Sequence, residues 1–68
     1  MQIKYFEDTD TLYVQLNEHE ISETRDLDEN TAIDIDKNGH LVAMTIEHAK
    51  AVTDISDFSF RHILAKPA

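Results

Sequence analysis

Residues 34–46 read Asp34-Ile35-Asp36-Lys37-Asn38-Gly39-His40-Leu41-Val42-Ala43-Met44-Thr45-Ile46. The first six residues match the start of an EF-hand calcium loop, D-x-D-x-N-G, in which oxygen ligands precede a glycine. The twelfth position of that loop normally holds a glutamate that binds calcium through both oxygens. Here it is Thr45, which has no carboxylate. The segment therefore lacks the ligand that a calcium loop most needs.

The residues around this segment favour a β-hairpin. Residues 32–36 alternate between apolar and polar, which is typical of a half-buried strand and not of the helices that flank an EF-hand. Residues 41–46 are mostly apolar and favour β-structure. Asn38 and Gly39 tolerate the positive φ of a tight hairpin turn. We therefore expect strands at residues 31–36 and 40–47, joined by a turn at 37–39.

The same alternation predicts three strands nearer the N-terminus. Residues 2–6 and 11–16 should form a hairpin across a polar turn, and residues 21–27 a third, more exposed strand. Because side chains alternate between the two faces of a sheet, ten apolar residues should share one buried face. They are Ile3, Tyr5, Leu12, Val14, Leu16, Ile33, Ile35, Val42, Met44 and Ile46.

The opposite face of the predicted sheet is mixed in character. Alternation places Phe6, Tyr13 and Leu41 there, where they would form an exposed apolar patch of the kind that marks an interface. Phe58 and Phe60 add apolar surface near the C-terminus. We expect these five residues to be contact residues of a protein interface.

The C-terminal segment is open to two interpretations. Ser56 and Asp57 are N-cap candidates for a short helix that runs through Leu64 and covers the sheet or reaches onto another subunit. Read as a strand, the same segment would place Phe58, Phe60 and Leu64 on one side. We adopt the helix, so the expected fold is α+β: a five-stranded antiparallel β-meander with a short C-terminal helix, in one domain of residues 1–68.

Composition restricts how this chain can be stabilised and what it can bind. A 68-residue chain buries little surface, and it has no cysteine for disulfides or thiolate metal sites, so we expect a homo-oligomer, a dimer or larger. The net charge of −8 disfavours direct binding to nucleic acid or anionic membranes and would suit a small basic protein partner. No apolar run is long enough to span a membrane and no signal peptide is recognisable, so we expect a cytoplasmic protein.

Catalytic chemistry has no clear location in the sequence. The four histidines are widely spaced, and neither a nucleophile motif nor a glycine-rich phosphate loop occurs. We therefore assign no catalytic, cofactor-binding or metal-binding residue. Asp10 is expected to bond turn amides and Arg25 to pair with Glu23, although Arg25 could also bind an anion. The alternative function is a metal-assisted or acid–base enzyme whose site at a subunit boundary uses Asp34, Asp36, Glu47 and His48.

Three blocks of sequence resemble a known family. They are Tyr5-Phe6-Glu7-Asp8-Thr9-Asp10-Thr11-Leu12-Tyr13-Val14-Gln15-Leu16, Glu23-Thr24-Arg25-Asp26-Leu27-Asp28-Glu29-Asn30 and residues 33–49. Together they are similar to the small bacterial family catalogued as domain of unknown function 2283. The resemblance covers about residues 3–49 and leaves residues 50–68 as an extension. Phe6 and Thr45 depart from the family pattern, which usually has Asp at the first and often Glu at the second. The resemblance implies a small β-rich protein, and because some members lie beside toxin-like genes, an antitoxin-like role.

Overall fold

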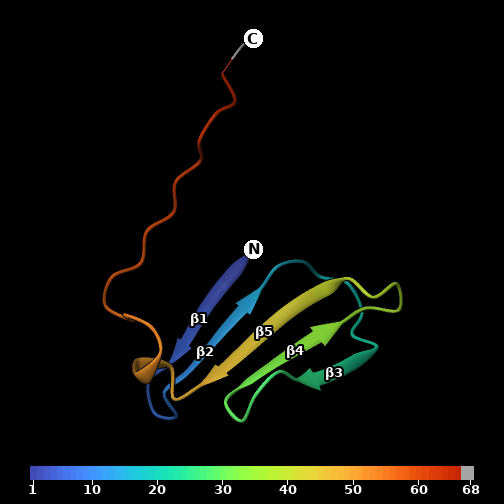
Figure 1. The fold of residues 1–68 in the computed structure, drawn as a ribbon, viewed down its shortest axis with the longest axis horizontal. Coiled ribbons are helices and arrows are strands. Elements are labelled where there is room, and N and C mark those ends of the chain that lie inside the picture. Colours follow the sequence, from blue (N-terminus) through green and yellow to red (C-terminus); the bar gives the residue numbers. More distant parts are fainter. Residues whose placement is uncertain (67–68) are drawn as a thin grey trace.

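The structure, a computed structural model that describes residues 1–66, is a single antiparallel sheet (Figure 1). The strands are β1 (Gln2–Phe6), β2 (Thr11–Gln15), β3 (Glu23–Asp26), β4 (Thr31–Ile35) and β5 (Leu41–Glu47). Their order across the sheet is β1-β2-β5-β4-β3, and every neighbouring pair is antiparallel. The predicted five-stranded antiparallel sheet is therefore confirmed.

The predicted β-meander is wrong, because β5 lies between β2 and β4. The segment that joins β2 to β3 crosses one end of the sheet to reach the far edge (Figure 1). Apolar content explains the order. β5 is the longest strand and mostly apolar, and in the centre it has a neighbour on both sides. β3 consists of four exposed polar residues, which suits an edge strand that must not attract other chains.

The β4–β5 hairpin forms as predicted. The backbone N–H of Asp36 donates to the carbonyl of His40 at 2.9 Å, and that of Gly39 donates to the carbonyl of Asp36 at 3.0 Å. Gly39 has a φ of 82°, in the left-handed region that glycine adopts readily. The calcium-loop motif is therefore part of a strand–turn–strand unit.

A register shift beside this turn changes the predicted position of Leu41. Asp34 pairs with Ala43 but Ile35 pairs with Leu41, so Val42 is an extra residue on β5, a β-bulge. Directly paired side chains lie on the same side of a sheet. Leu41 is thus grouped with Ile35 and not with Phe6 and Tyr13, because simple alternation from residue to residue does not hold across a bulge.

The predicted C-terminal helix does not form. Within residues 1–66 the structure has one 3₁₀ turn, η1 (Ala49–Ala51), and no α-helix, so none is long and apolar enough to cross a membrane. Residues 52–66 have no strand or helix and lead away from the sheet (Figure 1). The apolar residues of a helix at 57–64 would spread around its axis, and a helix this short is marginal unless one apolar face packs.

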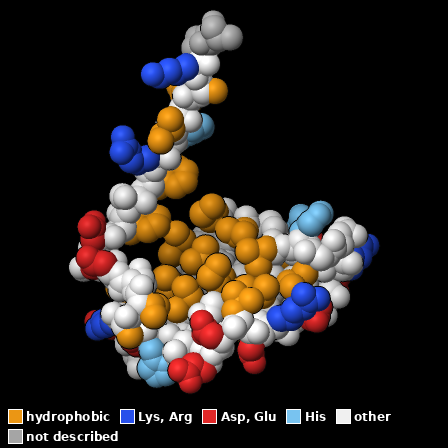
Figure 2. All heavy atoms as spheres, in the orientation of Figure 1, with side chains coloured by type: hydrophobic (Ala, Val, Ile, Leu, Met, Phe, Trp, Pro, Cys, Tyr) orange, Lys and Arg blue, Asp and Glu red, His pale blue; other side chains and the backbone are white. Residues whose placement is uncertain are grey.

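The register confirms the predicted grouping for eight of the ten apolar residues, since Leu16 lies beyond β2 and Val42 in the bulge, and of the ten only Ile35 and Val42 are buried. Ile3 pairs with Val14, and Val14 and Ile33 both pair with Met44, so all four lie on one face. Figure 2 shows apolar side chains gathered over the strands on the side facing the viewer. No large side chain among the described residues is fully buried, and the buried apolar residues are only Ile35, Val42, Ala43 and Ala49. The described strands thus form one layer with no second layer over the apolar face, on which Ile35 is buried and the other apolar strand residues stay partly or largely exposed.

Candidate interaction surface

The candidate functional surface is this uncovered face of the sheet, called the apolar face below. Strand pairing and alternation place nine apolar residues on it: Ile3, Tyr5, Leu12, Val14, Ile33, Ile35, Leu41, Met44 and Ile46. Five strands at the usual spacing of about 4.8 Å, each about 17 Å long, give the sheet a projected area of several hundred Å². Patches of that size on a monomer are usually functional contact surfaces.

The apolar face carries almost no net charge, although the chain is strongly acidic. The only charged strand residues that alternation places on it are Glu23 and Arg25, at the β3 edge. Arg25 donates from Nε and from a terminal guanidinium nitrogen to the two carboxylate oxygens of Glu23, each at 3.0 Å. This hydrogen bonding lowers the pKa of Glu23 below its ordinary value and raises the pKa of Arg25. The predicted ion pair is therefore present, and the charges oppose each other within one face.

The five predicted contact residues do not form a single patch. Phe6 and Tyr13 lie on the sheet face opposite to the apolar face, where Phe6 is exposed and Tyr13 is half-buried. Leu41 is paired with Ile35. Phe58 and Phe60 lie in the segment that leaves the sheet, with exposed fractions of 68% and 73%. Their part in an interface remains a prediction.

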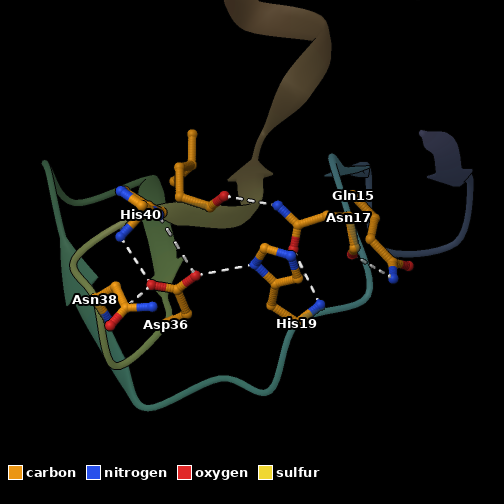
Figure 3. A network of polar contacts seen from close by, with 7 residues as sticks. Gln15, Asn17, His19, Asp36, Asn38 and His40 are labelled. Atoms are coloured by element: carbon orange, nitrogen blue, oxygen red, sulfur yellow. Dashed lines mark hydrogen bonds and ion pairs between the residues drawn. The ribbon is translucent and has the colours of Figure 1, made fainter.

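A polar network fixes the β4–β5 turn to the crossing segment between β2 and β3 (Figure 3). The carboxylate of Asp36 is buried; its Oδ1 accepts hydrogen bonds from the backbone N–H groups of Asn38 and His40, both at 2.9 Å. His19 approaches the other oxygen through Nδ1, also at 2.9 Å. Asn17 donates from its side chain to the carbonyl of Leu41 at 3.1 Å.

The network stabilises the ionised form of Asp36. The N–H of His40 and the imidazole of His19 hold the pKa of Asp36 below its ordinary value. A hollow of about 530 Å³ lies beside this network and is lined by His19, Glu20, Ile21, Ser22, Asp36, Lys37 and Asn38. The buried carboxylate in this lining, that of Asp36, already accepts hydrogen bonds from the turn and contacts His19 of the crossing segment. The role of this network is therefore structural: it holds the β4–β5 turn and the crossing segment together.

The aspartates of the calcium-like motif have separate partners. Asp36 binds the turn amides, whereas Asp34 accepts a hydrogen bond at 2.7 Å from the hydroxyl of Thr24 on the neighbouring strand. No group of three or more His, Asp or Glu residues in the described part of the chain is arranged to hold a metal ion. The carboxylates of Asp34 and Asp36 therefore serve as hydrogen-bond acceptors, for Thr24 of β3 and for the hairpin turn respectively.

A second polar cluster lies at the other end of the sheet and was only partly predicted. Asp10 has a φ of 53°, and its Oδ1 accepts hydrogen bonds from the Tyr5 hydroxyl at 2.6 Å and from the backbone N–H of Lys50 at 3.2 Å. The carbonyl of Asp10 accepts from Ala49 at 3.0 Å. The hydrogen bond to Asp10 raises the pKa of Tyr5 to about 12. Asp10 bonds backbone amides as predicted, but those of η1 rather than of its own turn.

The residues of the alternative enzyme site are not brought together within one chain. Asp36 follows β4, at the end of the sheet where β5 begins, while Glu47 and His48 lie at the end of β5. A seven-residue strand is about 20 Å or more long. His48 instead has its Nδ1 2.8 Å from Oδ1 of Asn30, in the loop before β4. A site built from these residues would need a contribution from two chains.

A family model matches most of this chain. The model described as "Protein of unknown function (DUF2283)" matches residues 2–50, which include all five strands and the first two residues of η1. Comparisons with curated proteins and with solved structures found no significant match. The apolar face and both polar clusters lie within the matched region, whereas residues 51–66 lie outside it. Because the match covers well over half of its residues, the chain belongs to the DUF2283 family.

Proposed function

We propose that this protein is a non-enzymatic interaction module that works as a homo-oligomer, in which a second copy covers the apolar face. The observation that carries the proposal is the contrast between nine apolar residues on one face and the absence of any fully buried large side chain in residues 1–66. A chain whose main apolar surface is only partly buried gains further stability when a second copy covers that surface.

The energetics support completion of the core by association. Full burial of a Val, Leu, Ile or Met side chain contributes about 1.5–3 kcal/mol relative to exposure, and a half-buried one forgoes part of that amount. Native domains are stable by only about 5–15 kcal/mol, so several half-buried side chains matter. The chain has no cysteine, so no disulfide can compensate.

The distribution of charge also allows a second copy to approach the apolar face. Two-fold dimers bring the same patch of each copy together, so a patch with a strong net charge would repel itself. On the apolar face Glu23 and Arg25 are paired, and the remaining charged strand residues lie on the opposite face. The strands therefore bring no net charge to the apolar face.

A pair of matched substitutions on β5 tests the proposal. Met44→Lys places a charge in the middle of the apolar face, while Thr45→Lys places the same charge on the opposite face of the same strand. We expect the wild-type and Thr45→Lys proteins to sediment as the same oligomer, and Met44→Lys to shift toward monomer. Equal association of both variants would contradict the proposal.

A second proposed function concerns the acidic surface: the oligomer neutralises a small basic protein, as an antitoxin does. The support is the net charge of −8, which would attract a basic protein. Affinity capture from the native cell, followed by mass spectrometry, tests it. We expect stoichiometric recovery of one small basic protein that is released by high salt. If captured proteins were substoichiometric and unrelated in charge, this second function would be abandoned.

A further inference from the structure

The segment after η1 differs in chemistry from the rest of the chain. Residues 58–66, called the arm below, contain four large apolar residues, Arg61 and Lys66, and no acidic residue. All 14 acidic residues precede the arm, so residues 1–57 carry a net charge of −10 and the arm +2. The arm is thus a basic, apolar peptide joined to a strongly acidic sheet.

The arm makes little use of its apolar side chains within its own chain. Phe58, Phe60, Ile63 and Leu64 have exposed fractions of 68%, 73%, 80% and 77%. No backbone hydrogen bond within residues 1–66 joins the arm to a strand. Figure 1 shows the segment leaving past the β1 side of the sheet, and Figure 2 shows the upper part of the segment extending well beyond the apolar face.

We infer that the arm of one copy lies along the apolar face of a second copy, and that the exchange is reciprocal. This inference rests on the proposed function, because it names the element of the second copy that covers the face. Identical copies can exchange a segment at a low cost in free energy, because the contacts that the segment makes with the partner replace equivalent contacts within its own chain.

Chain length allows the exchange. Residues 52–57 lie between η1 and the arm and, when extended, reach about 20 Å. The arm itself can extend to about 30 Å, which exceeds the width of about 20–25 Å expected for five strands. One arm can therefore cross every strand of a partner sheet without any change in the fold of residues 2–50.

The chemistry of the two surfaces is complementary. The apolar side chains of the arm would cover Val14, Ile33 and Met44 at the centre of the face, the kind of burial that stabilises most interfaces. Arg61 and Lys66 would then approach the acidic residues that border a partner sheet, where opposite charges favour correct docking. A second sheet face would bring apolar area alone, whereas the arm brings apolar area and the opposite charge.

Cysteine pairing tests where the arm lies, because the natural chain has no cysteine. Phe60→Cys protein is mixed with Val14→Cys protein under mild oxidation, and mixed disulfides are measured by intact mass. The matched control replaces Val14→Cys with Thr45→Cys, which lies on the opposite face. We expect the mixed disulfide with Val14→Cys to exceed the control several-fold. A chain that carries both Phe60→Cys and Val14→Cys should form interchain bonds in preference to an intrachain bond.

The outcomes distinguish a failure of the arm inference from a failure of the proposed function. If scattering shows an oligomer but the Val14→Cys yield equals that of the control, the arm inference fails and sheet-to-sheet contact remains. A predominant intrachain bond would mean that the arm folds onto its own sheet, which also overturns it. If the wild-type protein is monomeric, the proposed function fails as well.

Removal of the arm provides an independent measurement. A chain that ends at Asp57 keeps all five strands and both polar clusters. We expect its dimer to dissociate about tenfold more readily or more, since burial of one large apolar side chain alone corresponds to at least that factor. Unchanged association of a truncated chain with native circular dichroism would overturn the inference.

Discussion

Nδ1 of His19 lies 2.9 Å from Oδ2 of Asp36, although the two residues are 17 positions apart in the chain. This contact fixes the crossing segment to the β4–β5 turn at the end of the sheet where the chain passes from β2 to β3 (Figure 3). The crossing segment leads to β3 at the far edge, and β5 occupies the centre of the sheet. Asp36 supports the turn through Oδ1 and the crossing segment through Oδ2.

The first prediction concerns acid stability. The pKa of Asp36 is lowered in the folded protein, so its ionised form contributes stability that is fully present above the ordinary value of 3.8 and is lost as the pH falls through the folded pKa. Asp36→Asn should lower the denaturation midpoint at pH 7 and flatten its dependence on pH below about 4. Urea denaturation at a series of pH values measures both effects. A variant that keeps the acid dependence of the wild type would show that other carboxylates cause it.

The second prediction concerns Tyr5. Its hydrogen bond to Asp10 raises its pKa to about 12, from the ordinary value of 10.0. The neutral phenol therefore contributes stability that is present below pH 10 and is lost as the pH rises toward about 12. Absorbance titration of a Tyr13→Phe protein, in which Tyr5 is the only tyrosine, should show this late ionisation.

A conservative change at Asp10 controls that measurement. Asp10→Asn keeps a residue that tolerates a positive φ but removes the carboxylate that favours the neutral phenol. In the Tyr13→Phe background, it should move the ionisation of Tyr5 back toward its ordinary range. If Tyr5 ionised near its ordinary pKa in both proteins, the hydrogen bond across the β1–β2 turn would be absent in solution.

The third prediction concerns the small buried core. Ile35 is 6% exposed, so Ile35→Ala should cost about 2–4 kcal/mol of unfolding free energy. Leu27→Ala removes a comparable side chain that is 62% exposed, and it should cost less than about 1 kcal/mol. Denaturation at one fixed protein concentration compares the variants, because oligomer stability depends on concentration. Similar losses for both would place Ile35 outside the core.

The fourth prediction concerns the hairpin turn. Gly39 has a φ of 82°, and an added Cβ would meet no atom within 4 Å. Gly39→Ala should therefore cost about 1–2 kcal/mol through backbone strain alone, without a clash. Gly39→Asn should cost less, because asparagine enters the left-handed region more readily. Thermal denaturation ranks the three proteins; an alanine variant as stable as the wild type would mean that the turn adopts another conformation.

Alternation along the sequence predicted the elements of the sheet well. The pattern from Ile3 to Ile46 located five strands and grouped the apolar residues on one face, because side chains in a strand follow a period of two. Thr45 and the β-favouring flanks excluded the calcium loop. The family was recognised from the same residues, and the match to residues 2–50 confirms it.

Features that depend on three-dimensional context were missed. Alternation does not say which strands are neighbours, so the central position of β5 was not predicted. The bulge at Val42 reverses the alternation locally and changes the expected place of Leu41. The contacts of His19 with Asp36 and of Asp10 with Lys50 join residues far apart in sequence, and no local pattern indicates them. The C-terminal helix was predicted from cap residues alone, without an apolar stripe to stabilise it.

The mass of the wild-type protein in solution tests the central claim most directly. Light scattering coupled to size-exclusion chromatography, at micromolar concentration and neutral pH, should give a mass at least twice the chain mass of 7.8 kDa. We expect this because, within residues 1–66, no second layer packs on the apolar face, where Ile3 is exposed and most other apolar residues are only half-buried. A particle of 7.8 kDa that unfolds cooperatively, at a midpoint independent of protein concentration, would contradict it.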